Sequence, residues 1–296
     1  MTSVGAAILL VLFAAPVAPV HHAGPAPLVV LHYETEDKLV FLPVRVNGSR
    51  PLTFVLDSGA RHSIVDSAAA VTLKLRRISA DRTRGVGTGT VPRQHLEPID
   101  LLVGSVPVHV QDPWAIDLGQ AAGVRHVDGL LGADLFERYV VRIDPVRQAM
   151  TIAESAAFRD TGSGASVPLI LEDDRLYVDM TLTLGNGISE IHRMRIDTGS
   201  GDAASDNLVR RSPERRKSRQ GFGLGESFVD YSGVFETVKI GPYEIHRCWG
   251  PSNDHPAVGM ELLRRFTMTF DVPHRRLSLQ PNRHLNDPVP APPATP

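Results

Sequence analysis

Apolar and polar residues alternate along most of the chain with the two-residue period of β-strands. The alternation is visible at residues 39–46 (LVFLPVRV) and 176–184 (LYVDMTLTL), which are rich in Val, Leu and Thr, as half-buried strands are. Asn47-Gly48 follows the first of these segments and predicts a two-residue hairpin turn. Further strands are predicted at residues 99–110 and 233–246, each interrupted by a glycine turn.

Helical patterns are short and few. Asp66 or Ser67 is predicted to cap a short helix that starts at the following alanines. Residues 133–139 (ADLFERY) and 260–266 (MELLRRF) have the pattern of short amphipathic helices that lead into a strand. The order of elements predicts an all-β fold with a few short helices, arranged as two small β lobes rather than as βαβ units.

The chain contains an internal duplication, which is visible in three pairs of blocks. The pairs are residues 38–48 and 175–185, 54–60 and 194–200, and 132–152 and 259–279. They follow in the same order at similar offsets of 137 (175 − 38), 140 (194 − 54) and 127 (259 − 132). The third pair keeps Gly132 in register with Gly259 and Asp134 with Glu261, which strand alternation alone does not explain. We therefore predict two related lobes, at residues 28–155 and 166–282.

Two triplets carry the candidate chemistry, Asp57-Ser58-Gly59 and Asp197-Thr198-Gly199. Each follows an apolar strand, where a carboxylate is costly unless it is paired or used. The glycine lets the backbone turn tightly and lets another segment approach closely. The hydroxyl between carboxylate and glycine can reach the backbone of the opposite loop and hold the two turns together.

Two carboxylates within hydrogen-bond reach of each other cannot both ionise easily, so the pair retains one proton. The ionised member can then take a proton from a water molecule, while the protonated member donates to the carbonyl oxygen of the substrate. The titration belongs to the pair, so the sequence does not assign acid and base to individual residues.

The chain resembles the clan of aspartic peptidases that includes the retroviral proteases and the pepsins, in a bacterial tandem form with two retroviral-protease-like halves. In that clan the Asp-Thr/Ser-Gly triplet follows a strand, and a later hydrophobic-hydrophobic-Gly element packs beside it. The matching elements here are Leu130-Leu131-Gly132 and Ala257-Val258-Gly259, and the resemblance covers residues 28–282. It implies a bilobal acid-protease fold with the active site between two β-barrel-like lobes. It also implies that Asp57 and Asp197 hold the attacking water.

The clan closes a glycine-rich hairpin flap over its substrate, and a glycine-rich segment lies at the matching place in each half. The predicted flap and substrate-binding residues are Gly85, Val86, Gly87, Thr88 and Gly89 in the first half and Gly221, Phe222 and Gly223 in the second. An ordinary flexible hairpin is the alternative for either segment alone. The pepsin-type flap tyrosine has no match in residues 84–91.

The two halves differ beside the carboxylates. Ala60 follows the first triplet, whereas Ser200 follows the second. A hydroxyl at this position could donate to Asp197 and favour its ionised form, which predicts an asymmetric pair. The segment between aspartate and packing glycine is also shorter in the second half, so the two lobes should be unequal.

Composition removes several other classes of protein. Thirty-one basic and 33 acidic residues give a formal net charge of −2, without the basic footprint of a nucleic-acid-binding protein. The basic run at residues 210–219 is interpreted as a solvated loop without a function. The single cysteine excludes an intrachain disulfide. Twelve histidines form no zinc motif, although His62 lies close enough to Asp57 in sequence to line the cleft. We expect no metal and no cofactor.

The ends of the chain differ from the rest. Residues 5–20 are apolar and uncharged, which predicts a signal peptide at residues 1–23 with an uncleaved membrane anchor as the alternative. The anchor would be the only integral membrane span. The Pro-rich residues 283–296 are predicted to be a disordered tail.

These features together predict an aspartic endopeptidase that acts on a peptide or protein substrate. We expect a monomer that is exported to the periplasm or secreted, or tethered by its N-terminal segment. Two alternatives remain open: a non-catalytic protein that binds peptides or another ligand on the same bilobal fold, and an envelope-tethered structural module. Retention of both aspartates with both glycines favours catalysis, because buried like charges have no purpose in an inactive site.

Overall fold

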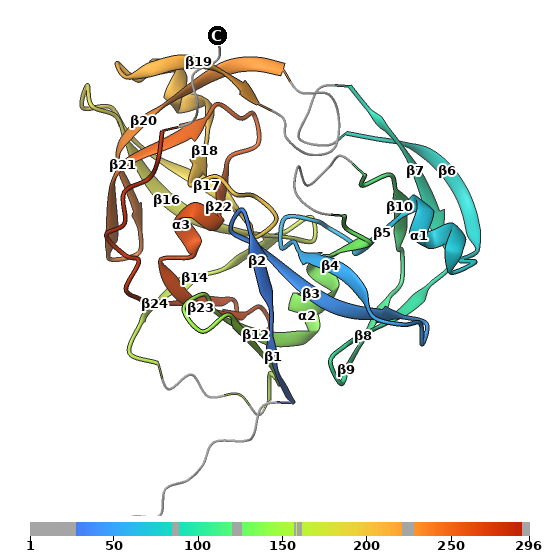
Figure 1. The fold of residues 1–296 in the computed structure, drawn as a ribbon. Coiled ribbons are helices and arrows are strands. Elements are labelled where there is room, and N and C mark those ends of the chain that lie inside the picture. The colour runs from blue at the N-terminus through green and yellow to red at the C-terminus, as the bar shows by residue number, and fades with distance from the viewer. Residues whose placement is uncertain are drawn as a thin grey trace, which may run out of the picture.

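The computed structural model describes residues 28–84, 89–119, 126–156, 158, 162–220 and 228–291, the side chains of residues 219 and 220 excepted. The predicted signal peptide lies outside this range. Strands dominate the described residues and the helices are short, so the predicted all-β fold is confirmed. The chain forms two lobes, with the earlier strands on one side of Figure 1 and the later strands on the other.

The first lobe is a ten-stranded sheet with two short helices. Its strands are β2 (Glu34–Glu36), β3 (Leu39–Val46), β4 (Leu52–Leu56), β5 (Ile64–Asp66), β6 (Arg77–Thr83), β7 (Val91–Leu96), β8 (Ile99–Val103), β9 (Val106–Val110), β10 (Trp114–Ile116) and β11 (Gly129–Leu131). Its helices are α1 (Ser67–Thr72) and α2 (Ala133–Arg138). Asp66 caps α1 as predicted, because its carboxylate accepts the amide hydrogens of Ala68 and Ala69. Asn47 and Gly48 adopt the positive φ angles that the predicted turn between β3 and β4 requires.

The second lobe is an eight-stranded sheet in a similar order. Its strands are β15 (Ile170–Glu172), β16 (Arg175–Thr183), β17 (Ser189–Asp197), β18 (Ala204–Ser205), β19 (Arg215–Gln220), β20 (Phe228–Ile240), β21 (Tyr243–Pro251) and β22 (Ala257–Gly259). It also contains the 3-10 helix η1 (Asn207–Arg211) and helix α3 (Met260–Leu263). The basic run was wrongly interpreted as a loop, because its C-terminal part forms β19 along the edge of this sheet. Paired charges on η1, such as Arg210 with Asp230, make the run compatible with regular structure.

A third sheet joins the two lobes. It has six strands: β1 (Val29–His32), β13 (Ala149–Glu154), β12 (Tyr139–Asp144), β23 (Phe266–Asp271), β24 (Arg276–Pro281) and β14 (Ala165–Pro168). At its centre β12 pairs with β23, and Arg142 lies opposite Thr269, its own counterpart at the offset of 127 (142 + 127 = 269). Equivalent residues that face each other define an approximate two-fold axis between the halves.

One large hydrophobic core extends through both halves of the chain. Phe136 of α2 packs against Phe270 of β23, with their ring centroids 5.0 Å apart. A smaller apolar cluster belongs to the first lobe alone and includes Phe41 and Val55. The lobes therefore share a framework, while the first lobe has an additional core of its own.

The C-terminal segment is ordered through its first part, so the prediction of a disordered tail is wrong for residues 283–291. The guanidinium of Arg265 is fully buried and donates to the carbonyl oxygens of His284, Leu285 and Asp287. Val289 is buried against the large core. The prolines prevent regular structure, but the buried arginine supplies hydrogen bonds that a proline-rich segment can accept.

Among the residues that the structure describes, no helix is both long and apolar enough to cross a membrane.

Candidate active site

Each triplet lies at the end of a central strand, beside the element that the resemblance predicts. β4 runs parallel to β11, and the amide of Asp57 donates to the carbonyl oxygen of Leu131. β17 runs parallel to β22, with Asp197 opposite Gly259. In both halves a strand from earlier in the chain is thus placed next to the hydrophobic-hydrophobic-Gly element.

The packing glycines cannot carry a side chain. A Cβ atom on Gly132 would lie 2.7 Å from the carbonyl group of His62, and one on Gly259 would lie 2.6 Å from the carbonyl oxygen of Asp202. Both contacts are with backbone, which cannot move aside easily. The close approach explains why glycine stands at the same place in both copies.

The hydroxyls of the two triplets bind the halves together reciprocally. Ser58 Oγ donates to the carbonyl oxygen of Ile196 at 2.8 Å, and Thr198 Oγ1 donates to that of Leu56 at 2.8 Å. Each hydroxyl also accepts the amide hydrogen of the other: Ser58 N lies 2.9 Å from Thr198 Oγ1, and Thr198 N lies 3.1 Å from Ser58 Oγ. Both side chains are fully buried. Four hydrogen bonds therefore fix the two turns against each other.

The same close approach brings the two carboxyl groups together. A Cβ atom on Gly59 would lie 2.6 Å from the carboxyl carbon of Asp197, and one on Gly199 would lie 2.5 Å from that of Asp57. Each carboxyl group thus packs against the glycine of the other triplet. Neither glycine could be replaced without displacing the opposite carboxyl group.

Asp57 is in an environment that favours its protonated form. Burial, followed by the negative charge of Asp197, raises the pKa of Asp57 from its usual 3.8 to about 7. The positive charge of Arg195 and the amides of Gly59 and Ala60 oppose this change. Both amides donate to Asp57 Oδ1, at 2.9 and 3.0 Å, so the other oxygen is the one left for a proton.

Asp197 has a partner that the sequence analysis missed. Arg195 Nη2 lies 2.9 Å from Asp197 Oδ2, and the two side chains are 18% and 11% exposed. The amide of Gly199 donates to the other oxygen, at 3.1 Å. Strand periodicity could have revealed the arginine, because a residue two positions before Asp197 lies on the same face of its strand.

The Ser200 hydroxyl does not donate to Asp197 as the sequence predicted. Its Oγ lies 3.3 Å from the amide nitrogen of Asp202 and also hydrogen-bonds the carboxyl group of Asp202, rather than that of Asp197. Asp202 is exposed, and it lies close enough to Asp197 for their charges to interact. The two carboxyl environments are indeed unequal, but the inequality comes from Arg195.

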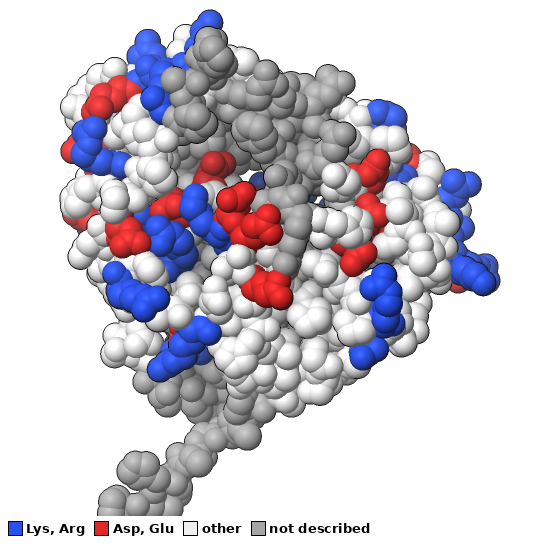
Figure 2. All heavy atoms as spheres, viewed as in Figure 1, with Lys and Arg blue, Asp and Glu red and all other residues white. Residues whose placement is uncertain are grey.

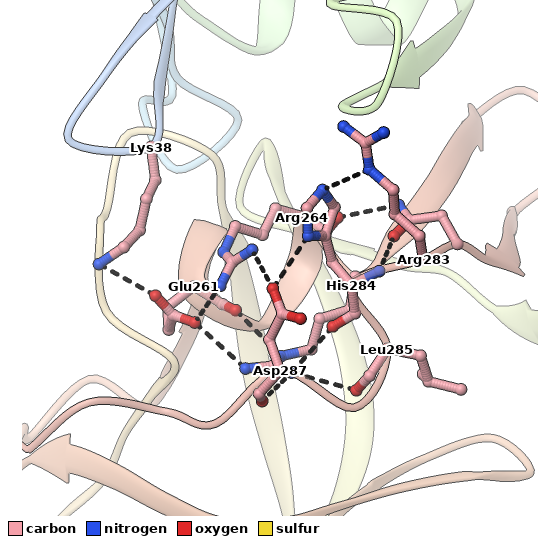
Figure 3. A network of polar contacts seen from close by, with 9 residues as sticks. Lys38, Glu261, Arg264, Arg283, His284, Leu285 and Asp287 are labelled. Atoms are coloured by element: carbon pink, nitrogen blue, oxygen red, sulfur yellow. Dashed lines mark hydrogen bonds and ion pairs between the residues drawn. The ribbon is translucent and has the colours of Figure 1, made fainter.

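Two hairpin tips support the site from opposite lobes. Lys38, at the β2–β3 turn, forms an ion pair with Glu261 of α3, 3.0 Å away (Figure 3). Asp174, at the β15–β16 turn, accepts from Nε of Arg61 at 2.8 Å, just after the first triplet. Each half thus contacts the region around the other half's triplet through a charged turn.

The predicted flap residues lie outside the described residues, except Gly89 at the edge of the first segment. Their flanking strands are described. β6 pairs with β7 up to Thr83 and Val91, and β19 pairs with β20 up to Gln220 and Phe228. Both glycine-rich segments therefore connect adjacent antiparallel strands, in positions related by the duplication.

An aromatic and charged cluster lies at the base of the first of these hairpins. The guanidinium of Arg93 lies 4.1 Å from the ring centre of Trp114, and the ring of His62 meets the same indole edge-on at 5.0 Å. Asp112 accepts from the indole nitrogen at 3.3 Å. His62 is therefore held against β10, close to the first triplet.

Charged side chains of both signs lie on the surface outside the site. Figure 2 shows acidic and basic side chains interspersed over the face that it displays. No group of three or more His, Cys, Asp or Glu side chains within the described ranges is arranged to hold a metal ion.

Residues 42–135 match a family model described as aspartyl protease. The matched range contains the first triplet and the element Leu130-Leu131-Gly132. It ends before the second triplet, whose relation to the first rests on the duplication and on the geometry of the site. The match supports the class of aspartic peptidases, and with it a peptide as substrate.

Proposed function

We propose that the chain is an aspartic endopeptidase in which Asp57 and Asp197 activate a water molecule between them. We further propose that the second half is a diverged copy of the first, as in a tandem retroviral-protease-like enzyme. The observation that carries the proposal is the reciprocal arrangement of the triplets, in which each carboxyl group packs against the glycine of the other. Such an arrangement places two acids where a single proton and a single water can be shared.

The proposed reaction needs no covalent intermediate. Water adds to the carbonyl carbon of the peptide, one carboxylate takes a proton from it, and the other carboxyl gives its proton to the carbonyl oxygen. A neutral gem-diol results. The C–N bond then breaks as the nitrogen takes the proton from the first carboxyl, and a diol hydroxyl returns a proton to the second. Both carboxyl groups end in their starting state.

Export and a monomeric state are part of the proposal. The apolar residues 5–20 support export to the periplasm or beyond, either free or anchored. Both triplets come from one chain, which supports a site that is complete without a second copy.

The test is cleavage of a peptide library by the full chain, its Asp57→Asn and Asp197→Asn variants, and Asp179→Asn as a matched control. Asp179 lies on β16 and is largely exposed. We expect cleavage by the wild type and the control, inhibition by a pepstatin-type inhibitor, and loss of activity in the two other variants. Cleavage that persists in Asp57→Asn would contradict the proposal. Peptide binding without cleavage by the wild type would favour the binding protein instead.

A further inference from the structure

The duplication provides a comparison of the residues that flank the two carboxyl groups. The offset of 140 relates Val55 to Arg195 (55 + 140 = 195), each two positions before an aspartate. Successive side chains of a strand alternate between its faces, so both residues lie on the same face as the carboxyl group that follows. One aspartate thus has an apolar neighbour at this position, and the other has a cation.

The contact of Arg195 with Asp197 is direct and sheltered. Its Nη2 donates to Asp197 Oδ2 at 2.9 Å, and little of either side chain reaches solvent. The Nε of Arg195 is buried and makes no hydrogen bond to the described residues. Burying a guanidinium with one nitrogen unsatisfied costs free energy. This cost indicates that the contact with the Asp197 carboxylate holds Arg195 in its buried position.

The other charged groups near the pair do not reproduce this effect. Asp202 follows the second triplet and carries a negative charge toward Asp197, while Lys38 of the opposite lobe lies near enough to act on Asp202. Tyr177 of β16, which lies opposite Arg195 in the sheet, supplies no cation. Arg195 is therefore the cation that contacts the pair among the described residues.

We propose that Arg195 is a positioning residue that places the negative charge of the pair on Asp197 and the shared proton on Asp57. The inference rests on the proposed function and makes it more specific. Asp197 then takes the proton from water, and Asp57 donates to the carbonyl oxygen of the peptide. After the C–N bond breaks, Asp197 is again ionised and Asp57 again protonated.

The consequence for the pH profile follows from the signs. With this assignment activity requires Asp57 to be protonated, so the loss of its proton limits activity at high pH. The positive charge of Arg195 lowers the pKa of Asp57, so the loss of this cation raises that pKa. Removal of Arg195 should therefore move the high-pH limb of the profile to higher pH, by about one unit.

The experiment compares kcat/KM against pH for the wild type, Arg195→Met, Arg195→Lys and the control Arg193→Met. Arg193 lies on the same strand two residues earlier, is half exposed, and pairs with Glu172 and Asp179. We expect the high-pH limb to shift upward in Arg195→Met, a partial return in Arg195→Lys, and no shift in Arg193→Met. A general loss of activity in Arg195→Met with an unchanged high-pH limb would overturn the inference, because a purely structural role predicts that result.

A second measurement does not depend on activity. The titration of ¹³C-labelled aspartate carboxyl groups is followed by NMR, and Asp57→Asn identifies the resonance of Asp57. That resonance should titrate at higher pH in Arg195→Met than in the wild type. An unchanged titration would refute the role of Arg195, whether or not the protein cleaves peptides. If the Asp57 resonance shifts as expected but the wild type cleaves no peptide, the role of Arg195 stands and the proposed function is refuted.

Discussion

Replacement of Thr198 by valine tests whether the two halves are held together by the reciprocal hydroxyls. Valine has nearly the shape of threonine, so the change removes the hydroxyl without leaving a large cavity. In the wild type Thr198 Oγ1 lies 2.9 Å from the amide nitrogen of Ser58 and 2.8 Å from the carbonyl oxygen of Leu56. In the variant both backbone groups lose this hydrogen-bond partner. An unsatisfied buried group costs about 1–3 kcal/mol, so the expected loss in the free energy of unfolding is roughly 2–4 kcal/mol.

The assay is equilibrium unfolding of the full chain in urea, followed by circular dichroism. Thr183→Val is the control, because Thr183 Oγ1 hydrogen-bonds Ser189 Oγ near the surface, and its loss should change the unfolding free energy by less than about 0.5 kcal/mol. The comparison holds if the denaturant slope is the same in all variants. A Thr198→Val protein as stable as the control would refute the conclusion that these hydrogen bonds join the halves.

Three further predictions follow from the described contacts. Because the pKa of Asp57 is raised from 3.8 to about 7 in the fold, its ionisation opposes folding. Asp57→Asn should thus be more stable than the wild type at pH 8, by up to roughly 4 kcal/mol, since each pKa unit corresponds to about 1.4 kcal/mol. The difference should vanish toward pH 4 in thermal unfolding, and Asp179→Asn should show no such trend. Gly132→Ala should reduce both stability and any peptidase activity, since its Cβ would lie 2.7 Å from backbone; unchanged unfolding would contradict this. Arg265→Met should release the C-terminal segment to limited proteolysis, read by mass spectrometry, whereas its exposed counterpart Arg138→Met should not.

Much of the fold could be predicted because the duplication and the strand alternation agree. The third pair of blocks places β12 and β23 at the same offset of 127 at both ends (139 + 127 = 266 and 144 + 127 = 271). The blocks do not show which strand each strand pairs with in the sheet. The pairing of β12 with β23 across the halves depends on packing of the completed lobes, which local patterns do not encode.

The errors of prediction have a common physical cause. A proline-rich segment was expected to be disordered because of its composition, yet the buried Arg265 binds its carbonyl groups. A basic run was expected to be a loop because of its charge, yet part of it pairs with β20. In both cases a distant partner compensates the local property, and such partners are visible only in the fold.

The inequality of the two halves matters most beside the carboxyl groups. In an aspartic peptidase made from two identical subunits, any residue next to one aspartate is also next to the other, because the two-fold axis repeats it. A cation at that position would stabilise both anions and would leave the location of the proton undecided. A single chain with a duplicated fold is free of this constraint. Here Val55 and Arg195 occupy equivalent positions, and so one side of the pair can specialise as base and the other as acid.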